Sequence, residues 1–289
     1  STAAVALQPK SAGLRFNLAT ALMGLGRNEA AIPEFREAIR LAPEYAFAHS
    51  NLGSVLSVVG RHAEAAVVLR EATRLQPDST FVRCNLALAL FYQGEIDEAQ
   101  REIREAIRLA PDLAWAHGFL AWCLASPNKL DRNPQDIEQA ISHARKALEL
   151  AVKDPLQTIE SHTCLGIAYY RKGTLDQAAT HLTKVIELER AAEHKTDTGE
   201  LDRAICMFFL AMTRWQADKK DEARRWYDDA ATWMKENKPD NPDLLRFRAE
   251  AADLLGIKET LNDETQFPEK IDAKSNMPKE TPPERDESK

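Results

Sequence analysis

The stretch AFAHSNLGSVLSVVGRHAEAAVVLREATRLQPDS, residues 46–79, decides the fold, because the chain repeats its pattern 34 residues earlier and 34 residues later. The units 12–45, 46–79 and 80–113 carry the same residue classes at matched places, namely Leu18, Leu52 and Leu86, then Gly26, Gly60 and Gly94, then Phe35, Leu69 and Ile103, and finally Pro43, Pro77 and Pro111. A fixed period of this length indicates a repeat array, in which each unit buries its apolar face against its neighbours.

Each unit is predicted to be a helical hairpin. Residues 46–59 place apolar side chains at i, i+3 and i+4 spacings, which predicts a first helix that Gly60 ends. Residues 63–75 have the same spacing and predict a second helix. Pro77 stops this second helix, because proline lacks an N–H and its ring clashes with the preceding turn. A small residue such as Gly53 leaves room for the two helices to approach closely.

This pattern resembles the tetratricopeptide repeat (TPR), because small and large residues fall at that family's spacing in three consecutive units. The resemblance extends over nearly all of 1–237 and is looser after 125. It implies an all-α fold, a right-handed superhelical solenoid of stacked antiparallel helix pairs. The first helix of each pair is expected to line the concave side.

The regular array is expected to fill residues 12–125, with a fourth unit that starts at 114 and ends near 154. Residues 1–11 match the last third of a unit, so we expect the chain to be a piece of a longer protein. A polar insert, 126–136, interrupts the fourth unit.

The second part of the array, 137–237, is less regular. Its units are expected at 159–192 and 204–237, separated by a charged connector, 193–203. Asn241-Pro242 is typical of a helix start, and 241–256 is predicted to be a capping helix that shields the last repeat. Its other face would carry Arg246, Glu250 and Asp253. The charged, proline-rich end, 257–289, is predicted to be a disordered tail.

Composition excludes several classes of protein. The formal net charge is −7 and no segment is strongly basic, which argues against a nucleic-acid binder. No apolar run approaches the roughly 20 residues of a membrane span, so a cytoplasmic protein is expected. The four cysteines, Cys84, Cys123, Cys164 and Cys206, form no CxxC pair and are predicted to be reduced and buried.

No enzyme motif is present. The chain has no Walker loop, GxGxxG, HExxH or GxSxG pattern, and no catalytic residue, metal or other cofactor is expected. His49, His117 and His162 share one place in their units but stand whole repeats apart, too far for a common metal.

The sixth residue of three consecutive units is asparagine: Asn17, Asn51 and Asn85. Asparagine is a weak helix former, but its side-chain amide can hold a peptide unit by both C=O and N–H. This looks like the asparagine ladder in the groove of peptide-binding TPR superhelices. The alternative is that each amide ties one repeat to the next. The surrounding inner face is expected to carry Phe16, Thr20, Phe47, Ser50, Ser54, Phe81, Cys84, Leu88 and Trp115.

This mixture suits an apolar or mixed peptide, although each aromatic residue alone could equally serve packing between hairpins. Some TPR domains hold the acidic C-terminus of heat-shock chaperones with a clamp of lysines, an arginine and asparagines. The matching places here hold Phe16, Thr20 and Phe81, and only Asn51 fits. A chaperone partner of the carboxylate-clamp type is therefore disfavoured.

A second periodic set lies on the other helix of each unit. It consists of the pairs Arg36/Arg40, Arg70/Arg74 and Arg104/Arg108, with Glu37, Glu71 and Glu105 in register. The arginines could form a basic ridge for phosphate. We favour a solvated convex face on which arginines pair with glutamates, because the chain is acidic overall.

The sequence therefore predicts a non-catalytic module that binds a peptide or partner protein in the concave groove. One alternative is a structural spacer. Another follows from residues 208–257, which are similar to the closing segment of TPR tails on large bacterial Ser/Thr protein kinases. That resemblance implies a regulatory region whose catalytic domain is not in this chain. The partner's identity and the oligomeric state stay open.

Overall fold

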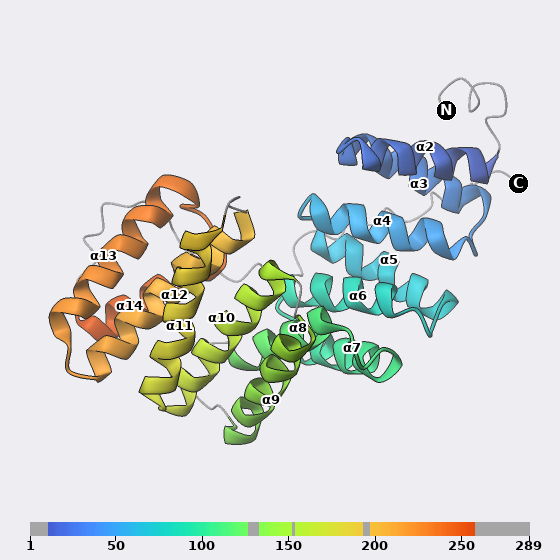
Figure 1. Cartoon of the computed structure of the whole chain (residues 1–289). Helices are drawn as coiled ribbons and strands as arrows, with labels where there is room; N and C mark the ends of the chain where they lie inside the picture. Colours follow the sequence, from blue (N-terminus) through green and yellow to red (C-terminus); the bar gives the residue numbers. More distant parts are fainter. Residues whose placement is uncertain (1–10, 127–132, 152–153, 193–196, 258–289) are drawn as a thin grey trace, which may run out of the picture.

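The computed structural model describes residues 11–126, 133–151, 154–192 and 197–257. Within these ranges the protein is all-α, as predicted, and its helices form stacked antiparallel pairs (Figure 1). The pairs are α2 (Ala12–Gly24) with α3 (Asn28–Leu41), α4 (Ala46–Val58) with α5 (His62–Leu75), α6 (Thr80–Tyr92) with α7 (Ile96–Leu109), α8 (Ala114–Ala125) with α9 (Pro134–Leu150), α10 (Pro155–Lys172) with α11 (Leu175–Ala191), and α12 (Asp197–Gln216) with α13 (Lys220–Asn237). A last helix, α14 (Pro242–Leu255), follows.

Glycines close the turns inside the first three pairs, as their spacing predicts. Gly26, Gly60 and Gly94 have φ angles of +70°, +80° and +82°, in the left-handed region that glycine adopts without steric cost. The turn after Gly60 is closed by the Arg61 N–H, which donates to the Leu56 carbonyl at 2.8 Å. The two helices of a pair therefore turn back on each other within three residues.

Small residues let the paired helices approach closely. A β-carbon placed on Gly53 of α4 would lie 2.3 Å from Cγ of Leu69 on α5. Likewise, a β-carbon placed on Gly166 of α10 would lie 2.5 Å from Cδ2 of Leu182 on α11. These two leucines fill the space that a side chain at the glycine would need.

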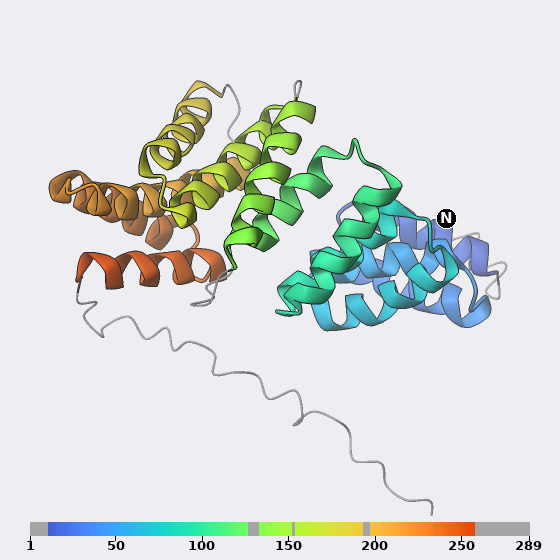
Figure 2. The same cartoon turned by 90° about the horizontal axis from the view of Figure 1, so that it is seen from below.

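The buried residues form two clusters that meet at α6. One cluster joins α2 to α7 and contains Phe35, Leu56 and Leu69. The other runs from α6 to α14 and is richer in aromatic residues, including Phe208, Phe209 and Phe247. In Figures 1 and 2, α2–α7 form one stack and α8–α14 form a second, thicker body.

The last helix does more than cap the last pair. α14 packs on α12 and α13 (Figure 2). Its side chains also reach α8 and α10. Phe247 contacts Trp122 of α8 and Phe209 of α12, with ring centroids 6.1 Å and 4.9 Å apart. α14 thus crosses the first helices of the last three pairs.

Two predictions about this region were wrong in detail. Arg246 and Glu250 do not face solvent: Arg246 donates to Ser126 Oγ at 2.7 Å, and Glu250 pairs with Arg171. Only Asp253 of that predicted outer face is exposed.

The connector 193–203 is shorter than predicted, because α12 already begins at Asp197. Residues 1–10, 127–132 and 258–289, which hold the predicted truncated repeat end, most of the insert and the tail, lie outside the described residues.

Candidate peptide-binding groove

The first helices of the pairs present four matched places on one face. They are the second, fifth, sixth and ninth residues of each unit, and their i, i+3, i+4 and i+7 spacing puts them in one stripe along the helix. The stripe contains every predicted groove residue: Phe47, Phe81 and Trp115 at the second place, Phe16, Ser50 and Cys84 at the fifth, Asn17, Asn51 and Asn85 at the sixth, and Thr20, Ser54 and Leu88 at the ninth.

Two aromatic side chains at the second place are open to solvent. Phe47 on α4 is 60% exposed and Phe81 on α6 is 59% exposed. At the matching place of α8, Trp115 is half-buried and stacks on Phe119 with ring centroids 5.0 Å apart. Large exposed apolar side chains at a constant interval mark a surface suited to a ligand.

A cavity of about 480 Å³ lies between Phe81 and Trp115. Its lining consists of Thr80, Phe81, Cys84, Asn85, Ala110, Leu113 and Trp115. The structure thereby brings four predicted residues, Phe81, Cys84, Asn85 and Trp115, together around one space. Its walls are largely apolar, with one amide, which is the chemistry that holds an apolar side chain beside a peptide group.

The three asparagines are not equivalent. Asn85 Nδ2 donates to Ser54 Oγ at 2.8 Å, which ties α6 to α4, as in the alternative interpretation of the sequence. The carbonyl oxygen of this amide and its second N–H remain for a ligand. Asn17 is exposed and Asn51 is half-buried. Within the described ranges, neither of these two side chains has a hydrogen bond.

Other residues of the stripe have structural contacts. Phe16 packs on Phe35 and Tyr45, with ring centroids 5.8 Å and 4.9 Å apart. Thr20 donates to the Phe16 carbonyl at 2.9 Å, within its own helix. Ser50 is only 3% exposed, so its side chain cannot contact a ligand, and the prediction is wrong for this residue.

The open part of the stripe lies in the N-terminal half. In the C-terminal half, α14 covers the same face, because Phe247 contacts Trp122, which is the ninth residue of its unit. The available surface therefore runs over α2, α4 and α6 to the start of α8.

A second cavity, of about 250 Å³, lies where α6, α8, α10, α12 and α14 meet. Aromatic residues and three acids line it: Glu160, Asp202 and Asp243. Burial, the largest cause, raises the pKa of each acid, and that of Asp202 reaches about 8. The repeat pattern does not indicate this cavity, since its residues come from 88 to 243. Glu160 and Asp202 stand among mostly polar neighbours in the sequence, in QTIESHT (157–163) and GELDRA (199–204), so no local signal marks them.

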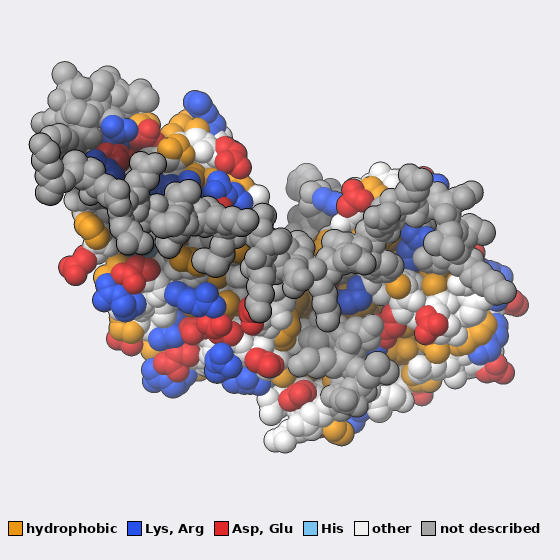
Figure 3. Space-filling model, turned by 180° about the vertical axis from the view of Figure 1, so that it is seen from behind, with side chains coloured by type: hydrophobic (Ala, Val, Ile, Leu, Met, Phe, Trp, Pro, Cys, Tyr) orange, Lys and Arg blue, Asp and Glu red, His pale blue; other side chains and the backbone are white. Residues whose placement is uncertain are grey.

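The convex arginines are paired, as favoured from the sequence. Within one helix, Arg40, Arg74 and Arg108 each pair with the glutamate three residues before, at 2.7 Å. Between repeats, Arg36 pairs with Glu64 at 2.6 Å and Arg70 with Glu98 at 2.9 Å, while Arg104 donates to Gln139 at 3.4 Å. On the face seen in Figure 3, basic and acidic side chains are interspersed. These arginines are thus engaged by the protein's own side chains.

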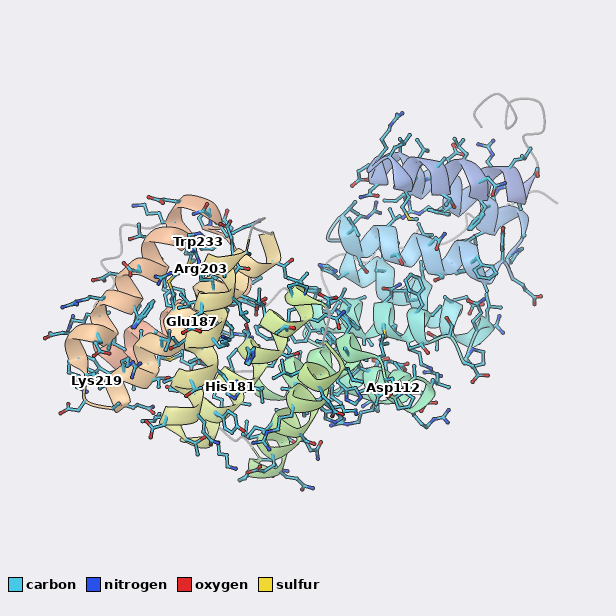
Figure 4. The ribbon with its side chains drawn as sticks, viewed as in Figure 1. Asp112, His181, Glu187, Arg203, Lys219 and Trp233 are labelled. Carbon is cyan, nitrogen blue, oxygen red and sulfur yellow. The ribbon has the colours of Figure 1, made fainter. Side chains whose placement is uncertain are left out.

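Four of the seven histidines form two pairs that the sequence did not indicate. His117 Nδ1 lies 2.9 Å from His143 Nδ1, and His162 Nδ1 lies 2.9 Å from His181 Nδ1. Burial, followed by the paired ring, lowers the pKa of His143 and of His162 to about 4. Figure 4 places His181 on α11, with Glu187 further along this helix. No group of three metal-ligating side chains occurs in the parts of the chain that the structure describes.

All four cysteines are free and buried, as predicted. Burial raises the pKa of the Cys84 thiol to about 11 and that of Cys123 to about 12. These thiols are therefore protonated at neutral pH and unreactive. Among the described helices, none has the length and apolar character needed to cross a membrane.

Several known structures have folds similar to that of this chain. A fragment of MamA from Desulfovibrio magneticus RS-1 is 26% identical, with a TM-score of 0.55, and the match covers 63% of this chain and 97% of that one. PilF of Pseudomonas aeruginosa is 18% identical, with a TM-score of 0.54, over 83% of this chain and 97% of that one. The APC/C complex Cut9–Hcn1 is 16% identical, with a TM-score of 0.62, over 86% of this chain and 44% of that one.

No curated protein sequence matches the chain. Sequence models of the tetratricopeptide repeat, however, match residues 3–80 and 163–242, and a further model of this repeat matches 81–113. These matches span most of the helical pairs described above, including the less regular ones after the insert. The chain belongs to the tetratricopeptide repeat family.

Proposed function

We propose that the protein captures an extended segment of a partner protein along the stripe formed by α2, α4 and α6. The observation that carries this proposal is the exposure of Phe47 and Phe81 beside the asparagines of the same helices. In a structural spacer, two solvent-exposed phenylalanines at a constant interval would have no role. The unpaired amides of Asn17 and Asn51 supply the polar contacts that an extended backbone needs.

The apolar cavity between Phe81 and Trp115 would hold one side chain of the partner. Binding of this kind combines backbone hydrogen bonds, which tolerate many sequences, with one or two pockets that select side chains. The protein would act by recognition alone, without catalysis. Its buried free cysteines suit a reducing, cytoplasmic compartment.

The test uses a random 12-residue peptide library displayed on phage. Peptides selected on the wild-type protein are remeasured by fluorescence anisotropy against the double variant Asn51→Ala/Asn85→Ala. Two lost amide contacts, each contributing about 1 kcal/mol, should weaken binding roughly ten- to thirtyfold.

Two controls separate binding from folding. Thr73→Ala removes a hydroxyl on α5, outside the stripe, that donates to the Leu69 carbonyl at 2.9 Å within its own helix, so this variant should bind as the wild type does. Val67→Ala alters an exposed apolar residue on α5, outside the stripe, and should change nothing. Equal affinity of the double variant and the wild type would refute the proposal.

The similarity of residues 208–257 to kinase tails supports a finer proposal, in which this module positions the substrate or regulator of a protein kinase domain encoded upstream. The matches reported above include no kinase. A glycine-rich loop with HRD and DFG motifs in the upstream reading frame is the expected observation, and their absence there would exclude the pairing.

A further inference from the structure

The cavity of about 250 Å³ combines an aromatic wall with carboxyl groups. Trp115 and Phe119 stack at an interplanar angle of 7°, and Phe119 meets Phe91 edge-on with centroids 5.6 Å apart. α10 contributes Glu160 and α12 contributes Asp202 to the lining of the same space. Stacked rings and carboxylates are together the environment that a protein uses to hold an organic cation.

Two of the three acids in this cavity, Glu160 and Asp202, have no basic partner among the described residues. The third acid, Asp243, pairs with Arg246 at 2.8 Å. Asp202 is 8% exposed. A hydrogen bond with the Thr163 side chain partly offsets the rise of its pKa, but its Oδ2 atom has no hydrogen-bond partner. Glu160 makes no ion pair with any residue that the structure describes. A buried carboxyl oxygen without a partner destabilises the fold unless the group is protonated or meets a ligand.

We propose that this cavity binds the side chain of an arginine or lysine of the captured protein segment. The cation would lie on the aromatic wall and pair with Asp202 and Glu160. This inference rests on the proposed function and adds the chemistry of its ligand. Trp115 lines both cavities, so the ligand would carry an apolar side chain on one side of this ring and a basic side chain on the other.

Binding of a cation here is coupled to proton release. Without a ligand, burial and the neighbouring Glu160 and Glu189 hold the pKa of Asp202 at about 8, so that its carboxyl is protonated at pH 7. The thiols of Cys164 and Cys206, which also lie near Asp202, stay protonated. The same cavity is lined by Tyr92 and by Asp243, which is paired with Arg246. A bound cation favours the charged carboxylate and therefore expels the proton. Affinity should rise with pH up to about 8, by at most tenfold per pH unit.

The experiment uses the peptides selected from the 12-residue library. Selected sequences should contain an arginine or lysine, and replacing that arginine by citrulline, its neutral isostere, should weaken binding at least about tenfold. We define the citrulline ratio as the Kd of the citrulline peptide divided by the Kd of the arginine peptide. In the Asp202→Asn and Glu160→Gln variants this ratio should fall toward 1. Asp253 is an exposed acid on α14, so Asp253→Asn is the matched control and should keep the citrulline ratio of the wild type. Thermal melting verifies that each variant is folded.

The outcomes distinguish the two proposals. Peptides that depend on Asn51 and Asn85 but show no basic residue, or keep their citrulline ratio in Asp202→Asn, overturn this inference and leave the proposed function intact. Basic peptides that depend on Asp202 but not on the asparagines support the inference and refute the asparagine stripe. Failure to select any peptide refutes both.

Discussion

Replacing Gly53 by alanine tests how one repeat differs from its neighbours. The matching places in the first and third units are Ala19 and Ala87. Each of these alanines is fully buried, so the other two units accommodate a β-carbon at this place. In the second unit the opposing residue is Leu69, and a β-carbon at 53 would lie 2.3 Å from its Cγ and 2.6 Å from its Cδ2. Contacts this short require Leu69 to leave its position.

The expected cost is moderate. Overpacking in a buried site destabilises by about 1–3 kcal/mol, whereas alanine gains about 0.5–1 kcal/mol over glycine inside a helix. Gly53→Ala should therefore lower the free energy of unfolding by about 1–2 kcal/mol. Leu69→Ile alone should cost less than about 1.5 kcal/mol. The double variant rebuilds the third unit's pair, an alanine facing isoleucine, and should be more stable than the two single effects predict by about 1–2 kcal/mol.

The assay is urea unfolding followed by circular dichroism for the four proteins of this cycle. Amide hydrogen exchange of residues 46–75 provides a local readout, because repeat arrays need not unfold in one step. Gly13→Ala is the control, since nothing lies within 4 Å of a β-carbon there, and it should be neutral or stabilising. Additive effects of the two substitutions would refute the argument from close packing.

Two further predictions concern other parts of the fold. The folded-state pKa of His143 and of His162, about 4, lies below the ordinary 6.5, so the unfolded chain binds more protons between these values. The free energy of unfolding should fall as pH drops from about 6.5 to 4, by about 1–2 kcal/mol per histidine after solvent screening. The double variant His143→Gln/His162→Gln should show a flatter dependence of this free energy on pH in the same range. An identical slope in the double variant would contradict the pairing. Glu250→Ala leaves Arg171 without its carboxylate in a mostly buried site, which should cost about 3 kcal/mol. It should also speed hydrogen exchange in α14 while leaving 12–113 unchanged, whereas protection of α14 equal to wild type would show that the ion pair does not hold this helix.

The sequence predicts the part of the fold that depends on neighbours in the chain. Gly60 ends α4, Pro77 follows α5, and the period places equivalent residues on one face, because each hairpin packs on the next one. The arginine–glutamate pairs follow from the same register: Arg70 reaches Glu98 because both belong to adjacent units. In such an array most tertiary contacts form between adjacent units, so the spacing of residues in the sequence predicts which of them touch.

Contacts between distant units were not predictable in this way. The pairing of Arg171 with Glu250 joins residues 79 positions apart, and it depends on α14 folding back instead of continuing the stack. No periodic pattern encodes the direction of a helix that is not a repeat. The acidic cavity has the same origin, because its Asp202 and Trp115 come together only through α10, which packs on both α8 and α12.

α14 also indicates what an occupant of the open stripe requires. It contacts Trp122, the ninth residue of the fourth unit, through the ring of Phe247. It is further held by an ion pair with Arg171. An aromatic anchor and a charge pair therefore take part in holding a segment on this face of the fold, together with buried aliphatic side chains such as Leu244 and Leu255. Among the described residues, no segment of the chain covers the matching places in the N-terminal half: Phe47 and Phe81 are exposed. The first turn of α14 lines the acidic cavity through Asp243. The protein's own last helix thus favours a partner segment that combines apolar and charged side chains over one that is purely apolar.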